Sequence, residues 1–288
     1  MRFGISTHLY HDRRLEREHL AQIAEYGFEA IELFATRSHF DYRDEAAVAA
    51  LADWLAGTGL SLESIHAPIT DRFGIGDQWA ASYSNAVSDN AARQAAVRET
   101  EAALQIARRI PYRTLVVHLG TPTSKNNPGD NNRAAALRSA EEISRLAEPL
   151  GVRVALEVIP NALSAAASLV SMLEGDLESS QTGICMDFGH AFLAGDVPDA
   201  IETAAEHLIA THVHDNHGRS DDHLVPYQGS IDWGAALVTM QKIGYERTYM
   251  MELANTGSPA AVLEEARRVR QRFERTLAQY HIDDDCLH

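Results

Sequence analysis

Short apolar runs alternate along the chain with longer stretches rich in Ala, Glu, Arg and Leu. Continuous apolar runs are typical of strands that are buried on both faces, as in a parallel sheet. The pattern therefore predicts eight strands separated by helices. The predicted strands are Arg2–Ser6, Ala30–Phe34, Ser61–His66, Thr114–His118, Arg153–Glu157, Gly183–Asp187, Ile209–His214 and Thr248–Glu252.

The stretches between the runs have the composition of helices. Asn90–Ile110 and Asn132–Leu150 are the clearest examples, because they consist mostly of residues with high helix propensity. A glycine suited to a helix C-cap follows the helix and precedes the next strand at four places, Gly27, Gly59, Gly151 and Gly244.

The last predicted helix begins at Ser258-Pro259, with Ser258 as the N-cap and Pro259 in the first turn, and runs to about Gln279. We expect the polar tail His281–His288 to be frayed.

Eight strand–helix units within 288 residues predict a single-domain α/β protein, a (β/α)8 TIM barrel that covers residues 1–288. A doubly wound open sheet is the alternative, and it is disfavoured because no GxGxxG follows the first strand. The longest loops, Ala67–Asp89 and Asp215–Ile231, follow strands. Both would lie on the face where barrels carry their active sites.

Composition and charge narrow the range of partners. The net charge is −16, from 25 Lys+Arg against 41 Asp+Glu, and such a chain repels nucleic acid. Cys185 and Cys286 form no CxxC pair, so we expect no disulfide framework. The sequence shows neither a signal-peptide pattern nor a run of about 20 apolar residues that could span a membrane. We therefore expect a soluble, cytoplasmic protein with no membrane or nucleic-acid partner, and a homo-oligomer stays open.

Residues of the metal-ligand types stand at the ends of the last six predicted strands. Strand ends of a barrel converge at one face, where clustered carboxylates repel each other unless a cation neutralises them. The sequence therefore predicts a divalent metal site, for Mn, Zn, Co or Mg. The strand-end residues and those that closely follow them are His66, His118, Glu157, Asp187, His190, His212, His214, Asp221, His223 and Glu252.

Other candidate residues are interpreted more simply. Cys185 lies within an apolar run and is expected to pack in the core. Trp79, in the long loop after the third strand, is a candidate for lining a substrate pocket. The histidines outside the strand-end register are interpreted as surface or loop residues: His8, His11, His19, His39, His207, His217, His281 and His288.

With these residues in view, the chain resembles the xylose-isomerase-like TIM-barrel superfamily, the sugar phosphate isomerase/epimerase proteins. The order and spacing of several short motifs along nearly the whole chain carry the resemblance. These motifs are FEAIELF, IHAP, VVHLG, LEV, MDFGH, and HVHDN followed by HLVPYQGSIDW.

The epimerase branch implies one divalent ion and a small carbohydrate-like substrate. Its metal ligands match Glu157, Asp187, His212 and Glu252, and the two glutamates match its acid/base pair. His190 matches a position that contacts a substrate oxygen, and we add His66 and Trp79 as substrate-binding candidates. The implied reaction is isomerisation or epimerisation of a sugar, keto-sugar or polyol through a metal-stabilised enediolate.

Two alternatives remain open at this point. The ligand pattern is also similar to that of endonuclease IV, a zinc phosphodiesterase that acts on abasic DNA. That pattern adds five candidate ligands and raises the number of ions to as many as three; they are His66, His118, His190, Asp221 and His223. The second alternative is a metal-dependent dehydratase or lyase that acts on a hydroxy-acid. The charge of −16 favours sugar chemistry over DNA repair.

Overall fold

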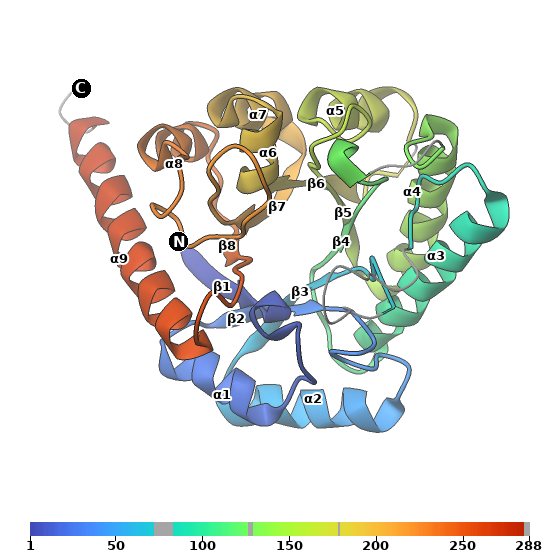
Figure 1. Ribbon diagram of the computed structural model, residues 1–288, viewed down its shortest axis with the longest axis horizontal. Helices are drawn as coiled ribbons and strands as arrows, with labels where there is room; N and C mark the ends of the chain where they lie inside the picture. Colours follow the sequence, from blue (N-terminus) through green and yellow to red (C-terminus); the bar gives the residue numbers. More distant parts are fainter. Residues whose placement is uncertain (72–82, 126–128, 178, 285–288) are drawn as a thin grey trace.

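Eight parallel strands pair in chain order, and β1 closes the ring by pairing with β8 (Figure 1). The computed structural model describes residues 1–71, 83–125, 129–177 and 179–284. The predicted TIM barrel is confirmed, and every predicted strand end agrees with the structure to within one residue. The strands are β1 (Arg2–Ser6), β2 (Ala30–Phe34), β3 (Ser61–His66), β4 (Thr114–Val117), β5 (Arg153–Glu157), β6 (Thr182–Asp187), β7 (Leu208–Val213) and β8 (Thr248–Met251).

A ring of helices covers the outside of the strands (Figure 1). The α-helices are α1 (Arg17–Glu25), α2 (Glu45–Thr58), α3 (Asn90–Leu104), α4 (Arg133–Ala147), α5 (Ala166–Gly175), α6 (Phe188–Ala194), α7 (Val197–Ala204), α8 (Trp233–Lys242) and α9 (Pro259–Asp284). Short 3₁₀ helices are η1 (Thr7–Tyr10), η2 (Gln105–Arg108), η3 (Thr123–Lys125), η4 (Glu148–Leu150) and η5 (Ala205–His207).

The helix boundaries differ from the predictions in two ways. The segments predicted as Asn90–Ile110 and Asn132–Leu150 each end in a 3₁₀ turn, η2 and η4, because a helix terminus often tightens in its last turn. Helix α9 continues to Asp284, beyond its predicted end at Gln279.

The predicted glycine connections have the backbone that glycine favours. Gly27, Gly59, Gly151 and Gly244 all have positive φ angles, between 69° and 79°. That left-handed conformation ends a helix and turns the chain toward the next strand, and it costs glycine little because glycine has no Cβ.

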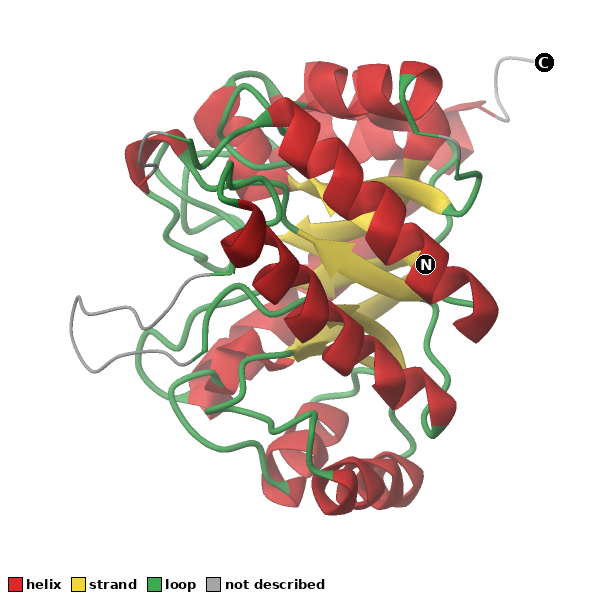
Figure 2. Ribbon diagram, turned by 90° about the vertical axis from the view of Figure 1, so that its right-hand side faces the viewer, coloured by secondary structure: helices red, strands yellow, loops and turns green. Residues whose placement is uncertain are grey.

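The barrel interior is filled by side chains rather than by solvent. Cys185 is fully buried beside Val116, Ala155 and Ile209, which come from neighbouring strands. Cys185 is therefore a core residue, as predicted. Longer loops gather at the end of the barrel opposite the N-terminus (Figure 2). Among the described residues, no helix has both the length and the apolar character needed to cross a membrane.

Candidate metal centre

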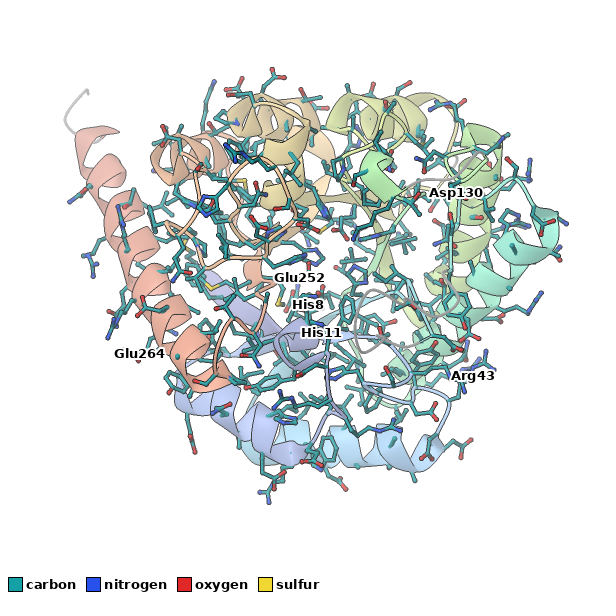
Figure 3. The ribbon with its side chains drawn as sticks, viewed as in Figure 1. His8, His11, Arg43, Asp130, Glu252 and Glu264 are labelled. Carbon is teal, nitrogen blue, oxygen red and sulfur yellow. The ribbon has the colours of Figure 1, made fainter. Side chains whose placement is uncertain are left out.

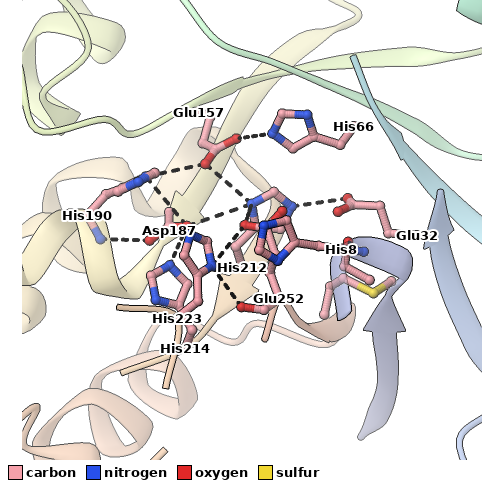
Figure 4. A network of polar contacts seen from close by, with 12 residues as sticks. His8, Glu32, His66, Glu157, Asp187, His190, His212, His214, His223 and Glu252 are labelled. Atoms are coloured by element: carbon pink, nitrogen blue, oxygen red, sulfur yellow. Dashed lines mark hydrogen bonds and ion pairs between the residues drawn. The ribbon is translucent and has the colours of Figure 1, made fainter. Parts of the chain in front are cut away.

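Four strand-end side chains meet at the carboxyl end of the barrel (Figure 4). Glu157 ends β5, Asp187 ends β6, His212 lies near the end of β7, and Glu252 directly follows β8. All four residues are buried, and one ligand atom from each lies within 4.8 Å of the other three. This is the set that the resemblance implied for the metal, and parallel strands bring it together because their ends share one face.

Several polar atoms of this group lack hydrogen bonds. Both carboxylate oxygens of Glu157, Nδ1 of His212 and Oε1 of Glu252 are buried without a hydrogen-bond partner among the described residues. Buried polar atoms are nearly always satisfied, and leaving one unpaired costs about 1–3 kcal/mol. Carboxylate and imidazole ligands that converge in this way fit a divalent transition metal.

Glu157 also joins a second group of residues. Its Oε2 lies 3.0 Å from Nε2 of His118 and 3.4 Å from Nε2 of His66. The three residues form a separate candidate ligand cluster. One carboxylate therefore lies between the four-residue cluster and the pair of histidines.

A third group surrounds Asp221 in the loop after β7. Oδ2 of Asp221 lies 3.1 Å from Nε2 of His190 and 3.2 Å from Nε2 of His223. His214 stacks on His223 with ring centroids 4.1 Å apart, and its Nε2 lies 3.0 Å from Oδ2 of Asp187. The structure thus brings together all nine residues of the larger ligand pattern.

Backbone carbonyls fix the orientation of three of these histidines. Nδ1 of His66 donates to the backbone carbonyl of Ala67. Nδ1 of His190 donates to the backbone carbonyl of Val158, and Nδ1 of His223 donates to the backbone carbonyl of Glu252. A carbonyl only accepts, so Nδ1 carries the proton and Nε2 is presented to the cluster with a free lone pair when the ring is neutral. Metal-binding histidines in proteins are commonly held in this way.

The motif MDFGH explains the local geometry around β6. Asp187 is both the last residue of β6 and the N-cap of α6, where its Oδ1 accepts from the backbone N–H of His190 at 2.7 Å. A Cβ on Gly189 would collide with the ring of His214. Asp, Gly and His are therefore each needed for the two imidazoles and the carboxylate to meet.

Asp215 organises the loop that carries the third group. Its buried carboxylate accepts hydrogen bonds from the backbone N–H groups of Tyr227 and Ile231, at 2.9 and 3.1 Å, and from Nε1 of Trp233 at 2.8 Å. Within that loop His223 has a φ of 48°, a left-handed conformation that is uncommon outside glycine. Such strain often marks a functional position.

Burial and neighbouring charged side chains shift the pKa values of these residues in opposite directions. Burial raises the pKa of Glu157 and of Asp187, but the neighbouring histidines outweigh it, so both pKa values lie below their usual range. Burial lowers the pKa of His190, while Asp187 and Asp221 raise it well above its usual value. A metal that binds here must therefore displace protons from histidine.

A cavity of about 430 Å³ opens above these clusters, a volume typical of small-molecule sites. Phe34, Ile69 and Pro122 contribute an apolar wall. Seven of the candidate ligands also line the cavity: His66, His118, Glu157, His190, Asp221, His223 and Glu252. Trp79, which we expected to line this pocket, lies outside the described residues.

Two of the histidines that we interpreted as surface or loop residues are buried, although His39 does lie in the loop after β2. His8, on η1, is buried and lines the cavity, and it lies with His11 and Glu252 near the middle of the ring of helices (Figure 3). Its ring stacks on that of His223 with centroids 4.7 Å apart. His39 is fully buried, with Nδ1 2.7 Å from the carbonyl of Arg13. Neither residue lies at a strand end, so strand register gave no signal for them.

Comparisons with known proteins agree with this architecture. The chain is 26% identical over 262 residues to protein MJ1311 of Methanocaldococcus jannaschii, covering 88% of this chain and 84% of that one. It is 27% identical over 134 residues to an inosose isomerase of Bacillus licheniformis, covering 42% and 47%.

A solved structure, that of a D-tagatose 3-epimerase-like protein, superposes with a TM-score of 0.79 at 23% identity, covering 97% of this chain and 99% of that one. This likeness establishes the fold alone. The model of the family described as xylose isomerase-like TIM barrel matches residues 20–273. The chain therefore belongs to the xylose isomerase-like TIM barrel family.

Proposed function

We propose that this protein is a divalent-metal-dependent isomerase or epimerase that acts on a sugar, keto-sugar or polyol. The observation that carries the proposal is the buried four-residue cluster, with its ligand atoms within 4.8 Å of one another and several of them lacking hydrogen bonds. Two of the four residues, Glu157 and Glu252, line a cavity large enough for a monosaccharide. Likeness to a sugar epimerase-like protein and an inosose isomerase supports the same class of substrate.

Glu157, Asp187, His212 and Glu252 would hold the ion. When bound there, a divalent ion would supply positive charge that acidifies a C–H bond next to a substrate carbonyl.

Glu157 and Glu252 supply the proton transfer in this proposal. Both carboxylates face the cavity, and they come from β5 and the end of β8. Glu157 removes a proton from one face of the substrate, and Glu252 returns a proton to the opposite face. His190, whose Nδ1 donates to the carbonyl of Val158, offers Nε2 to a substrate oxygen. The buried surroundings exclude bulk water from the transferred proton.

Proton exchange with solvent tests this function across a whole class of substrates at once. The metal-loaded protein is incubated in D2O with a panel of ketoses and inososes, and deuterium incorporation is read by NMR. We expect exchange at the carbon next to the carbonyl for at least one compound. The variants E157Q and E252Q should abolish it, whereas E148Q, which alters an exposed glutamate, should not. A panel without exchange, or E157Q and E252Q that exchange like wild type, would refute the proposal.

A second function has specific support from the two flanking clusters. His66, His118 and Glu157 form one, and His214, Asp221 and His223 form another. Such a set could hold up to three zinc ions, as the resemblance to endonuclease IV implies, and would then suit hydrolysis of a phosphoester. The net charge of −16 opposes binding to DNA. Cleavage of an abasic-site duplex with two or three zinc ions per chain would favour this function.

A further inference from the structure

The geometry points to Glu32 as a positioning residue that fixes the ring of His212 and thereby sets the affinity of the four-residue cluster for a divalent ion. The inference rests on the proposed metal dependence. Glu32 is neither a lining residue of the cavity nor one of the four candidate ligands. It acts through His212 alone.

Glu32 lies in the interior of the barrel, on β2, and is fully buried. Its Oε2 lies 3.1 Å from Nε2 of His212 on β7 and accepts from the hydroxyl of Ser64 at 2.8 Å. Ser64 is the residue paired with Glu32 across the β2–β3 register. Figure 4 shows the contact between Glu32 and His212 on the side of the imidazole away from the other carboxylates.

This contact determines which nitrogen of His212 faces the candidate ligands. A carboxylate accepts, so Nε2 of His212 carries the proton that is donated to Glu32. When the ring is neutral, Nδ1 then has the lone pair, and it lies 3.3 Å from Oε1 of Glu157 and 3.5 Å from Oε2 of Glu252. Nδ1 has no hydrogen-bond partner among the described residues. Histidine ligands whose other nitrogen donates to a carboxylate are better oriented and more basic toward a metal.

A purely structural role explains Glu32 less well. Burying a carboxylate costs several kcal/mol, and a well-packed apolar side chain often replaces a buried ion pair without loss of stability. Oε1 of Glu32 has no hydrogen-bond partner in the described part of the chain, so the residue is not a fully satisfied structural element. Orientation of His212 is the use that the contacts of Oε2 support.

The test compares wild type with E32Q, which keeps the shape of the side chain but removes its charge. The metal-free proteins are titrated with Zn²⁺ alone by calorimetry. We expect E32Q to bind roughly 10- to 100-fold more weakly, the usual effect of losing an outer-shell partner of a metal ligand. The matched control is E63Q, because Glu63 is a barrel carboxylate whose Oε2 pairs with Arg2 at 2.8 Å. E63Q should bind within about twofold of wild type.

A second measurement separates positioning from folding. In the zinc-loaded protein labelled with ¹⁵N-histidine, long-range ¹H–¹⁵N spectra should show His212 with its proton on Nε2. If E32Q fails to fold, S64A removes only the hydroxyl that holds Oε2 of Glu32 and should still weaken zinc binding. If the folded variant binds zinc with wild-type affinity, the role of Glu32 is refuted and the proposed function is not. A wild-type protein that binds no divalent ion refutes both this role and the proposed function.

Discussion

Nε2 of His66 and Nε2 of His118 lie 3.2 Å apart, and both face Oε2 of Glu157. The two histidines come from the neighbouring strand ends of β3 and β4, and they lie outside the four-residue cluster. Glu157 is the residue shared by both groups. This relationship raises the question of whether the protein uses one metal ion or more.

Replacing His118 with alanine tests whether the second cluster is needed to hold metal. In the one-ion account, H118A keeps one ion per chain, because the four-residue cluster does not include His118. Elemental analysis of the purified variant measures the metal content. D187N is the companion variant and should lower the content, since it removes a charge from the four-residue cluster. Loss of an ion in H118A would instead show that His66 and His118 hold metal.

Removing the charge of either proposed acid/base should abolish most turnover. General acid–base groups commonly contribute about 100- to 10,000-fold in rate, so E157Q and E252Q should each lower kcat by roughly that range. Turnover is measured at saturating metal, and metal content is determined in parallel because both residues are also candidate ligands. Near-normal turnover in either variant would contradict proton transfer by two glutamates.

Asp215 should matter for stability as well as for the site. Asparagine offers one acceptor oxygen where the carboxylate offers two, so D215N leaves some of the loop N–H donors unpaired. We expect a loss of about 3 kcal/mol in the free energy of unfolding, because hydrogen bonds to charged groups contribute about 1.5–3 kcal/mol each. Urea denaturation measures it, with D222N in the same loop as control. A loss equal to that of D222N would refute this role.

His39 should make the protein sensitive to acid. Burial lowers its pKa from 6.5 to about 4, against the opposing hydrogen bond to the carbonyl of Arg13. The unfolded chain therefore takes up the proton first. Neutral, buried His39 therefore contributes to the free energy of unfolding above pH 6.5. This contribution, about 3 kcal/mol in total, is lost as the pH falls toward 4.

The variant H39Q should lose less stability than wild type between pH 7 and pH 4. The free energy of unfolding of the metal-free proteins is measured at both values, so that metal release does not contribute. H217Q, which alters an exposed histidine, serves as control and should follow wild type. Identical pH profiles for H39Q and wild type would show that His39 is not a source of the acid sensitivity.

The sequence predicted the strands well because most of them are short apolar runs that alternate with longer helical stretches. Strand ends also predicted the wider group of side chains that meet, because a closed barrel leaves little freedom in where strand ends lie. The choice of Glu157, Asp187, His212 and Glu252 from that group came from the family resemblance.

Contacts across the barrel were not predictable in the same way. Glu32 lies within the apolar motif AIELF, where nothing local indicates that it faces His212, 180 residues further along the chain. His8 reaches the cavity from a short 3₁₀ helix after β1. Asp215 folds its loop through hydrogen bonds to residues up to 18 positions away. These roles depend on tertiary geometry rather than on periodicity.

The metal content of the purified wild-type protein, measured by elemental analysis without added metal, distinguishes the two proposed functions. We expect one divalent ion per chain in the wild type and a lower content in D187N. Two or three zinc ions per chain would contradict the one-ion isomerase and favour a hydrolase that uses the flanking histidines. A chain without bound metal that also fails to take up Mn²⁺, Co²⁺, Mg²⁺ or Zn²⁺ would contradict metal dependence altogether.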